Sequence, residues 1–441
     1  MLEPLRNRTY RQLFAAQIIA LIGTGLLTVA LGLLAYDLAG GNAGAVLGTA
    51  LAIKMIAYVG VSPIAGAVAG MLPRRAMLVA LDLVRAAIAL FLPFVDQVWQ
   101  IYVLIFILQS ASAAFTPTFQ ATIPDILPEE NDYTKALSLS RLAYDLETLL
   151  SPMLAAALLT VMNFHTLFAG TALGFLLSAA FVLSVVLPRP KEARAMSFAQ
   201  RLTQGARIYL ATPRLRGLLA LNMAAAAGAA IVFVNTIVIV REILGLGDQA
   251  VAITLAAFGF GSMAAACILP RILERYSDRA VMVAGAGLMT PPLLIAAFAL
   301  ERLQSQNAWT AILTLWPMLG AGYAMVVTPT GRLLRRSAQE ADRPALFAAQ
   351  FALSHACWLV TYPMAGWLGA KAGLPLTLIA HAALTVSATI LALTLWPAAD
   401  PDIIEHAHPE LPATHPHVGQ PGGLRHAHVF LIDHLHRRWP A

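Results

Sequence analysis

Long apolar stretches recur along the chain, separated by short polar breaks. A helix needs about 20 consecutive apolar residues to cross the hydrocarbon core of a bilayer. Reading for such stretches predicts twelve transmembrane helices, at residues 12–37, 44–70, 76–95, 99–120, 137–160, 164–187, 215–240, 249–270, 279–300, 308–330, 344–369 and 375–397. The pattern therefore predicts an all-α membrane protein, and a single long break at 188–214 divides its spans six and six.

The two sets of six spans share a short sequence repeat. A Leu-Pro-Arg tripeptide closes the second span at 72–74 and the eighth at 269–271, an offset close to that between the first and seventh spans. Two parallel six-helix repeats are typical of transporters that bind their substrate between the repeats. We therefore predict four segments, namely a bundle at 1–188, a linker at 189–214, a bundle at 215–398 and a tail at 399–441.

Composition excludes a soluble protein. Hydrophobic residues make up 59% of the 441 residues and charged residues only 12%, whereas soluble domains carry about 25% charged residues. We find no phosphate-binding loop and no nucleophile elbow in the sequence, which argues against an enzyme and against direct ATP drive. Nothing indicates nucleic-acid binding or a cleavable signal peptide.

The basic residues fall mainly on one side of the predicted membrane. With both termini in the cytoplasm, 24 of the 29 Lys and Arg residues are cytoplasmic and only Arg241, Arg302 and Lys371 lie outside. Cytoplasmic loops carry an excess of Lys and Arg, so this count supports twelve spans and this orientation. The remaining two, Lys54 and Arg85, lie within spans.

The linker has the pattern of a short helix. Ser197 is a favourable N-cap, and Phe198, Leu202 and Tyr209 recur near helical spacing. Two placements are open: the helix lies on the cytoplasmic membrane surface, or it packs against the bundle.

Several motifs resemble the major facilitator superfamily over residues 1–398. The segments at 5–11, 82–86, 115–120 and 124–128 are similar to its drug:proton antiporter branch, which includes macrolide and siderophore exporters. The gating loop between spans 2 and 3 keeps part of the superfamily's signature in Gly66 and in the pair Arg74 and Arg75, while Gly70 and Met71 replace an acidic and a basic residue. The resemblance implies export by alternating access.

Two ionisable groups stand out within the spans. Lys54 lies near the middle of the second span, with Tyr58 one turn further on the same face. A charge at bilayer depth costs about 2.5–3.5 kcal/mol on insertion scales, so such a residue is a functional candidate. Lys54 has two interpretations, a group that releases a proton or attracts an anion, or a fixed partner of a carboxylate on a neighbouring helix.

The fifth span is a candidate for proton coupling. Arg141 and Asp145 share one face of this span, and Glu147 lies well round from Asp145. A carboxylate at this depth can bind and release a proton as the protein changes conformation, which proton antiport requires. The alternative is a self-neutralising pair of Arg141 and Asp145. Asp82 and Arg85, three residues apart in the third span, predict a structural ion pair.

Other polar residues within the spans also have two interpretations. His355 and His381, in the last two spans, are proton carriers or ligands, or else hydrogen-bonded packing residues. A second group either lines a cavity or joins helices by hydrogen bonds: Gln109, Ser112, Thr116, Asn222 and Asn235.

The tail holds eight of the eleven histidines, in four His-x-His pairs: His406 and His408, His415 and His417, His426 and His428, and His434 and His436. In an extended chain, residues two apart project to the same side, so each pair can offer two imidazoles to one ion. Imidazole suits nickel, cobalt and zinc, with Glu405, Glu410 and Asp433 as further ligands. The tail resembles the His-rich C-termini of nickel-resistance exporters, and we expect bound nickel, cobalt or zinc there and no other cofactor.

Together these patterns predict a monomeric proton-coupled exporter in the inner membrane of a bacterium. Its partners are the lipid bilayer, protons and a small solute. Two substrates compete: a divalent metal such as nickel or cobalt, favoured by the tail, and a lipophilic drug or siderophore-like molecule, favoured by the branch resemblance. Lys54 counts against a metal unless its ammonium is paired or neutral. The alternative from another class is a metal-sensing membrane receptor that does not transport.

Overall fold

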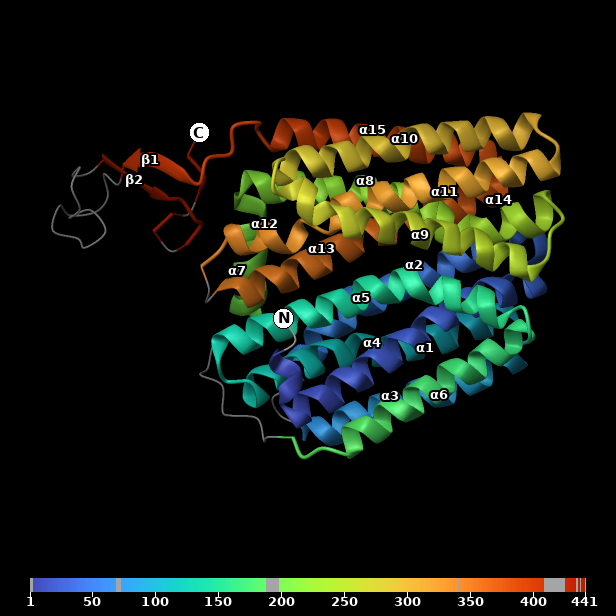
Figure 1. Cartoon of the computed structure of the whole chain (residues 1–441), viewed down its shortest axis with the longest axis horizontal. Coiled ribbons are helices and arrows are strands. Elements are labelled where there is room, and N and C mark those ends of the chain that lie inside the picture. Colours follow the sequence, from blue (N-terminus) through green and yellow to red (C-terminus); the bar gives the residue numbers. More distant parts are fainter. Residues whose placement is uncertain are drawn as a thin grey trace.

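The structure is a computed structural model that describes residues 3–68, 73–187, 198–339, 342–407, 425–433, 435–436 and 438–440. Within these residues, twelve long helices form two bundles that lie side by side (Figure 1). The first bundle contains α1 (Arg8–Ala39), α2 (Ala43–Val68), α3 (Arg74–Phe91), α4 (Val98–Ile126), α5 (Glu130–Leu158) and α6 (Phe164–Leu183). The second contains α8 (Pro213–Ile237), α9 (Asp248–Leu273), α10 (Asp278–Arg302), α11 (Ser305–Val327), α13 (Arg343–Pro363) and α15 (Leu374–Leu395).

These helices confirm the predicted all-α membrane fold with two six-helix repeats. Ten stretches of the described residues are long and apolar enough to cross a membrane, and one of them, Arg8–Val61, contains both α1 and α2. The remaining long helix, α5, carries charged residues along its length, Glu147 among them. Polar residues within a span mark function by default, so α5 draws attention first.

Polar caps and glycines set several of the helix ends. The side chains of Asn7, Asn163 and Ser277 accept hydrogen bonds from the third backbone N–H that follows each of them, which fixes the starts of α1, α6 and α10. Gly40 ends α1 with a φ of 52°, and Gly373, with a φ of 83°, precedes α15. A positive φ favours glycine because it has no Cβ.

Shorter elements join the long helices. They are η1 (Glu3–Arg6), η2 (Gly40–Asn42), η3 (Leu92–Phe94), α7 (Phe198–Ala211), α12 (Thr330–Arg336) and α14 (Gly369–Ala372), with two π-helical segments, η4 (Val238–Ile243) and η6 (Met364–Leu368). The π segments continue α8 and α13 directly. Such segments occur often at functional sites.

The linker helix α7 packs against the second bundle. Tyr209 is fully buried, and its hydroxyl donates to Oε1 of Gln350 on α13 at 2.5 Å. A Cβ at Gly205 would lie 2.1 Å from the carbonyl oxygen of Ala345, so the two helices are in backbone contact. The structure therefore supports the placement in which the helix packs against the bundle; Ser197 lies outside the described residues.

The tail contains a small β-hairpin that the sequence analysis did not predict. β1 (Ile403–Ala407) pairs with β2 (Arg425–Val429) in antiparallel register, with Ile403 opposite Val429 and Ala407 opposite Arg425. The all-α class therefore describes the membrane part and not the tail. Figure 1 shows the hairpin beyond the end of the second bundle.

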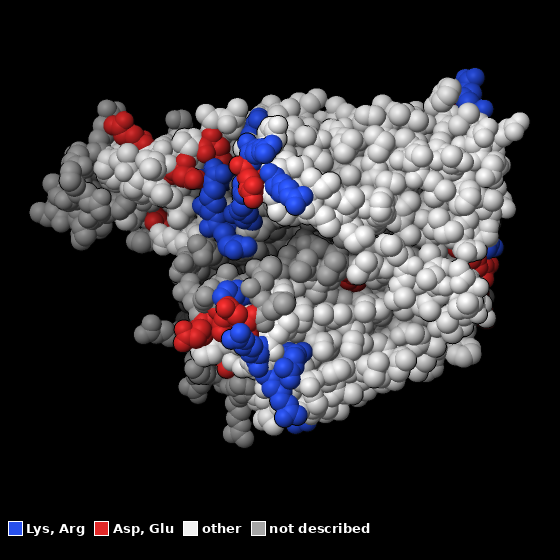
Figure 2. Space-filling model, viewed as in Figure 1, with Lys and Arg blue, Asp and Glu red and all other residues white. Residues whose placement is uncertain are grey.

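The two bundles are closed together at one end. We call the end that carries both termini, α7 and α12 the charged end, because Figure 2 shows most of the visible Lys, Arg, Asp and Glu residues there. At the opposite end, Trp367 donates to Thr49 at 2.9 Å and Tyr36 donates to Glu242 at 2.9 Å, each across the two bundles. Figure 2 shows a hollow between the bundles at the charged end, so the structure is open there and closed at the opposite end.

Candidate transport site and metal-ligand cluster

Lys54 and Glu147 bring opposite charges together within the first bundle. The Lys54 ammonium is attracted to the Glu147 carboxylate on α5, and its Nζ lies 5.8 Å from the centre of the Tyr58 ring. Glu147 also faces α1, because its Oε1 lies 3.2 Å from the position that a Cβ of Gly25 would take. The counter-charge of Lys54 therefore comes from another helix and not from its own.

Aromatic stacking joins this pair to the second bundle. The Tyr58 ring stacks on the imidazole of His355, with centres 5.2 Å apart and an interplanar angle of 1°. Phe351, one turn before His355 on α13, contacts both rings. Nδ1 of His355 lies 2.6 Å from the Phe351 carbonyl oxygen, so Nδ1 carries the proton and Nε2 the lone pair. The site thus lies at the interface between the bundles.

Hydroxyl and amide groups join three helices of the first bundle. Thr116 on α4 and Tyr144 on α5 share a hydrogen bond of 3.0 Å, and Ser140 on α5 donates to Gln17 on α1 at 3.0 Å. These bonds tie α1 and α4 to α5, the helix that carries Glu147.

Aromatic residues of the second bundle form an aromatic wall that begins on α13, the helix of His355 and Phe351. Their rings form a chain of contacts with centres between 4.9 and 6.2 Å apart, through Phe258, Phe233, Tyr323, Trp358 and Tyr362. Such a wall favours contact with apolar or planar groups.

Several other predicted residues have packing roles. Asp82 and Arg85 form the predicted structural pair, in which Ser178 donates to Asp82 at 2.7 Å. His381 is buried with Nδ1 2.7 Å from the Ala227 carbonyl oxygen, and Asn235 donates to the Ala365 carbonyl oxygen at 3.2 Å.

Three of the remaining candidates have no described contact with the charged pair, and two more have side chains that the structure does not describe. Gln109, Ser112 and Asn222 are buried. The side chains of Arg141 and Asp145 lie outside the described part of the structure, although both residues belong to α5.

The tail hairpin brings histidines from different pairs together. His406 on β1 faces His426 on β2, and His428 lies two residues further on the same face. Nitrogen atoms of these three side chains lie within 4.8 Å of one another. Nε2 of His436 lies 3.0 Å from Nε2 of His406, so a fourth imidazole contacts this group through His406.

The sequence pattern allows each His-x-His pair to offer two imidazoles to one ion, and the hairpin brings together histidines from three of these pairs. His426 and His428 do share a face, but the cluster takes single histidines from two other pairs, because strand pairing decides which side chains meet. Glu405 is exposed and points away from the cluster, since neighbours in a strand project to opposite faces. The other predicted tail ligands lie outside the described residues: His408, Glu410, His415, His417 and His434.

Asp433 holds the imidazole of His436 by a hydrogen bond to Nδ1. Its Oδ1 accepts hydrogen bonds from Nδ1 of His436 at 3.0 Å and from the backbone of Leu435 and His436. Burial raises the pKa of Asp433, but its bonds with His436 and Leu435 outweigh burial and hold that pKa below the ordinary value. Asp433 therefore presents a charged carboxylate to the back of an imidazole.

A sequence profile of the Major Facilitator Superfamily matches residues 13–233 and again 218–432. The chain belongs to this superfamily. Its relatives include macrolide efflux protein A of Streptococcus pyogenes, 26% identical over 182 residues that make up 40% of this chain and 44% of the relative. Another is the uncharacterized MFS-type transporter YfiS of Bacillus subtilis, 25% identical over 47% of this chain and 51% of the relative. The chain thus spans about half the length of the curated relatives it matches.

Solved structures of superfamily transporters share the fold of almost the whole chain. A bacterial homologue of the human lysosomal transporter Spinster, in an inward-facing conformation, covers 90% of this chain with a TM-score of 0.69 at 11% identity and is itself covered completely. A D-xylose-proton symporter covers 89% with a TM-score of 0.68 at 15% identity, and 98% of it is covered. The chain is therefore a multi-pass membrane protein with the fold of these transporters.

The gating loop of this superfamily member holds only the first bundle together in the described residues. Arg74 forms an ion pair with Asp125 at the end of α4, and Arg75 donates to the Leu183 carbonyl oxygen of α6. Gly66 lies in α2, and Gly70 and Met71 lie outside the described residues.

Proposed function

We propose that the protein is a proton-coupled exporter that works by alternating access in the inner membrane of a bacterium, as a monomer with its charged end in the cytoplasm. The observation that carries this proposal is the charged pair of Lys54 and Glu147 beside His355, at the interface between the two bundles. Groups at that interface change their surroundings when the bundles rock against each other. Efflux is favoured by the likeness to macrolide efflux proteins.

Glu147 is the proposed proton carrier. While it is ionised, it balances the charge of Lys54 in a medium where an isolated charge is costly. A proton on Glu147 removes that balance, so protonation changes the stability of the open and closed arrangements of the site. An inward proton movement can then be exchanged for outward movement of the substrate.

The proposed substrate is a divalent transition metal ion such as nickel or cobalt. His355 offers an imidazole nitrogen and Glu147 a carboxylate, and both are ligand types that such ions accept. Because Lys54 is attracted to Glu147, its charge is partly balanced and opposes a bound cation less than an isolated ammonium would. The histidine cluster of the tail independently favours metal as the substrate.

A second candidate substrate is a lipophilic organic molecule. The aromatic wall that includes Phe351, Trp358 and Tyr362 favours this alternative, because aromatic rings suit planar and apolar groups. The likeness to macrolide efflux protein A favours it as well.

Inverted membrane vesicles separate these proposals. Vesicles with an acid interior are loaded with a pH-sensitive dye, and nickel, cobalt and zinc are added in turn, followed by a panel of lipophilic drugs. Collapse of the gradient on metal alone supports metal:proton antiport, and collapse on drugs alone supports the second candidate. An unchanged gradient with both sets of compounds contradicts proton-coupled export of either class.

Matched variants test the site. Glu147→Gln keeps the shape of the side chain and removes its titration, so it should abolish the substrate-induced signal. Glu301→Gln, at an exposed position near the end of α10, is the control and should leave the signal unchanged. A full signal from Glu147→Gln would reject Glu147 as the proton carrier.

A further inference from the structure

We propose that the tail hairpin is a regulatory metal site, in which an ion bound by His406, His426, His428 and His436 clamps the hairpin onto the charged end of the second bundle. The proposal rests on the proposed function in one respect, since the quantity it regulates is export. The bound ion is a cytoplasmic signal, separate from the substrate path at Lys54 and Glu147. The ligands come from the hairpin and the segment after it, and the clamp consists of contacts with α7, α8 and α12.

Three imidazoles of the cluster hydrogen-bond to oxygen atoms through Nδ1. Nδ1 of His406 bonds to the Ile404 carbonyl oxygen at 2.9 Å, Nδ1 of His428 to the Val429 carbonyl oxygen at 2.8 Å, and Nδ1 of His436 to Asp433 at 3.0 Å. A carbonyl or carboxylate oxygen only accepts, so each Nδ1 carries a hydrogen. In a neutral imidazole the lone pair then belongs to Nε2, the nitrogen that a metal ion would bind.

Two of these lone pairs meet at close range. Nε2 of His406 and Nε2 of His436 lie 3.0 Å apart, and two lone pairs at that distance repel unless a cation lies between them. Imidazole nitrogens bound at 2.0–2.1 Å to one tetrahedral ion are about 3.3 Å apart. The spacing in the cluster is therefore close to that of a metal site, with a shared proton as the competing occupant.

The ligand chemistry selects the class of ion. Four imidazoles suit zinc, nickel, cobalt and copper, whereas calcium and magnesium prefer oxygen ligands. Asp433 behind His436 makes the carboxylate–histidine arrangement that fixes a ligand's orientation in many metal sites. We therefore assign the site to a divalent transition metal.

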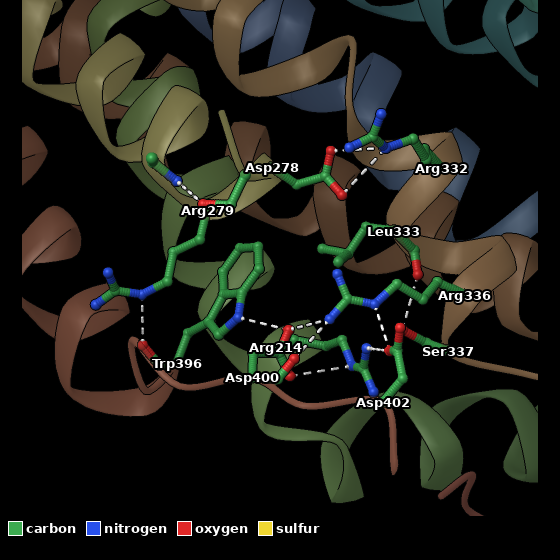
Figure 3. Close-up of polar contacts among 12 residues, drawn as sticks. Arg214, Asp278, Arg279, Arg332, Leu333, Arg336, Ser337, Trp396, Asp400 and Asp402 are labelled. Carbon is green, nitrogen blue, oxygen red and sulfur yellow. Dashed lines mark hydrogen bonds and ion pairs between the residues drawn. The ribbon is translucent and has the colours of Figure 1, made fainter. Parts of the chain in front are cut away.

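Ion pairs fasten the hairpin to the second bundle (Figure 3). Asp402, directly before β1, accepts from Arg336 of α12 at 2.6 Å and from Arg214 of α8 at 3.0 Å. Asp400 accepts from Arg336 at 2.8 Å and from the Trp396 indole at 3.1 Å. Arg214 is 1% exposed, so these carboxylates balance a buried cation.

The segment after β2 reaches the linker helix. Phe430 and Ile432 are buried in the same apolar core as α8 and α15. The Asp433 carbonyl oxygen accepts from Arg207 of α7 at 2.7 Å, and its carboxylate accepts from Gln339 at 3.3 Å. An ion that fixes His436 also fixes Asp433, and through it the helix that precedes the second bundle.

Binding is tested on the full-length protein in detergent by titration with nickel, cobalt or zinc against a chromophoric chelator, with magnesium as a non-binding control. The expected result is one tight ion per chain that is lost when His406, His426 and His428 are replaced by Ala. A matched variant removes the other four tail histidines, at 408, 415, 417 and 434, and should keep the tight ion. The site is overturned if the tight ion is lost only in the matched variant or in neither variant. It is also overturned if the wild-type protein binds no tight ion, because a shared proton then occupies the cluster.

The clamp is tested by hydrogen exchange with and without zinc. Zinc should slow exchange at least threefold in α7 and α12 of the wild-type protein and have no such effect in the triple histidine variant. The variant with Asp400→Asn and Asp402→Asn should still bind the ion but lose the protection of α12. Equal protection in that variant overturns the clamp. Neither test requires transport. A result that rejects metal export would therefore not reject the hairpin metal site, and a result that rejects the site would not reject the export proposal.

Discussion

Gly48 on α2 lies where the two bundles touch at the end opposite the termini. A Cβ at this position would lie 2.6 Å from the Tyr362 carbonyl oxygen and 3.1 Å from Cα of Gly366. Ordinary contacts of a Cβ are longer than about 3.4 Å, and overpacking typically costs about 1–3 kcal/mol. Because both neighbours are backbone atoms, they cannot turn away, and Gly48→Ala should destabilise the arrangement that is closed at this end.

This penalty destabilises only the arrangement that is closed at the end opposite the termini, because the bundles separate at Gly48 when that end opens. A penalty of about 2 kcal/mol changes the equilibrium between the two by about 30-fold. We therefore expect Gly48→Ala to populate the arrangement that is open at the opposite end and to slow transport. Gly60→Ala is the matched control, because it raises helix propensity in the same helix and its Cβ would meet no atom within 4 Å.

Spin-label distances measure this equilibrium. In a Cys267→Ser background, labels at Asp37→Cys on α1 and Gln249→Cys on α9 report the separation of the bundles at the opposite end. We expect a new population at longer distance in Gly48→Ala and none in Gly60→Ala. Identical distance distributions in the two variants would refute the claim that backbone contact at Gly48 holds the bundles together.

Three further predictions follow from single side chains. Asp82→Ala leaves Arg85 buried without its counter-charge and should lower the free energy of unfolding by about 3–5 kcal/mol; an unchanged melting temperature in detergent would contradict this. Asp433→Asn should weaken zinc binding to the hairpin by about 10–100-fold, and Asp433→Glu should restore part of it; chelator competition measures both, and wild-type affinity for Asp433→Asn would reject the supporting role. Burial raises the pKa of Asp402, but Arg336 and Arg214 outweigh burial and lower it, so the stabilisation that Asp402 provides is complete above the ordinary carboxyl pKa of about 3.9 and is lost as pH falls through the lower folded value. The protection of α12 against hydrogen exchange, corrected for intrinsic rates, should therefore stay constant between pH 5 and 8. A loss of this protection near pH 5.5 would contradict the prediction.

The membrane fold could be predicted from the sequence because span length and charge bias act along the chain. A helix must be long and apolar to cross the bilayer, and the basic residues follow the loops, so twelve spans could be counted without any tertiary contact. Even α5, whose charges break the apolar pattern, could be placed by that count. The pair of Asp82 and Arg85 was predictable for the same reason, because three residues along a helix define a contact.

The contacts between elements could not be predicted in this way. The attraction of Lys54 to Glu147 depends on which helices are neighbours, and the stacking of Tyr58 on His355 depends on how the bundles meet. The cluster of His406 with His426 depends on strand register across a long connection. The charge of Asp402 beside two arginines gave no sequence signal, because its partners lie 66 and 188 residues away.

Simultaneous flux of nickel and protons in one sample decides whether export is coupled to protons through Lys54 and Glu147. Purified protein is reconstituted into liposomes loaded with a pH-sensitive dye, and uptake of radioactive nickel is counted while the dye reports protons leaving the lumen. The account predicts nickel uptake that is coupled to proton exit, that requires an acid interior, and that disappears in Glu147→Gln while Glu301→Gln behaves like the wild type. Nickel movement without proton movement, or equal movement in the Glu147→Gln variant, would contradict proton-coupled export through this site.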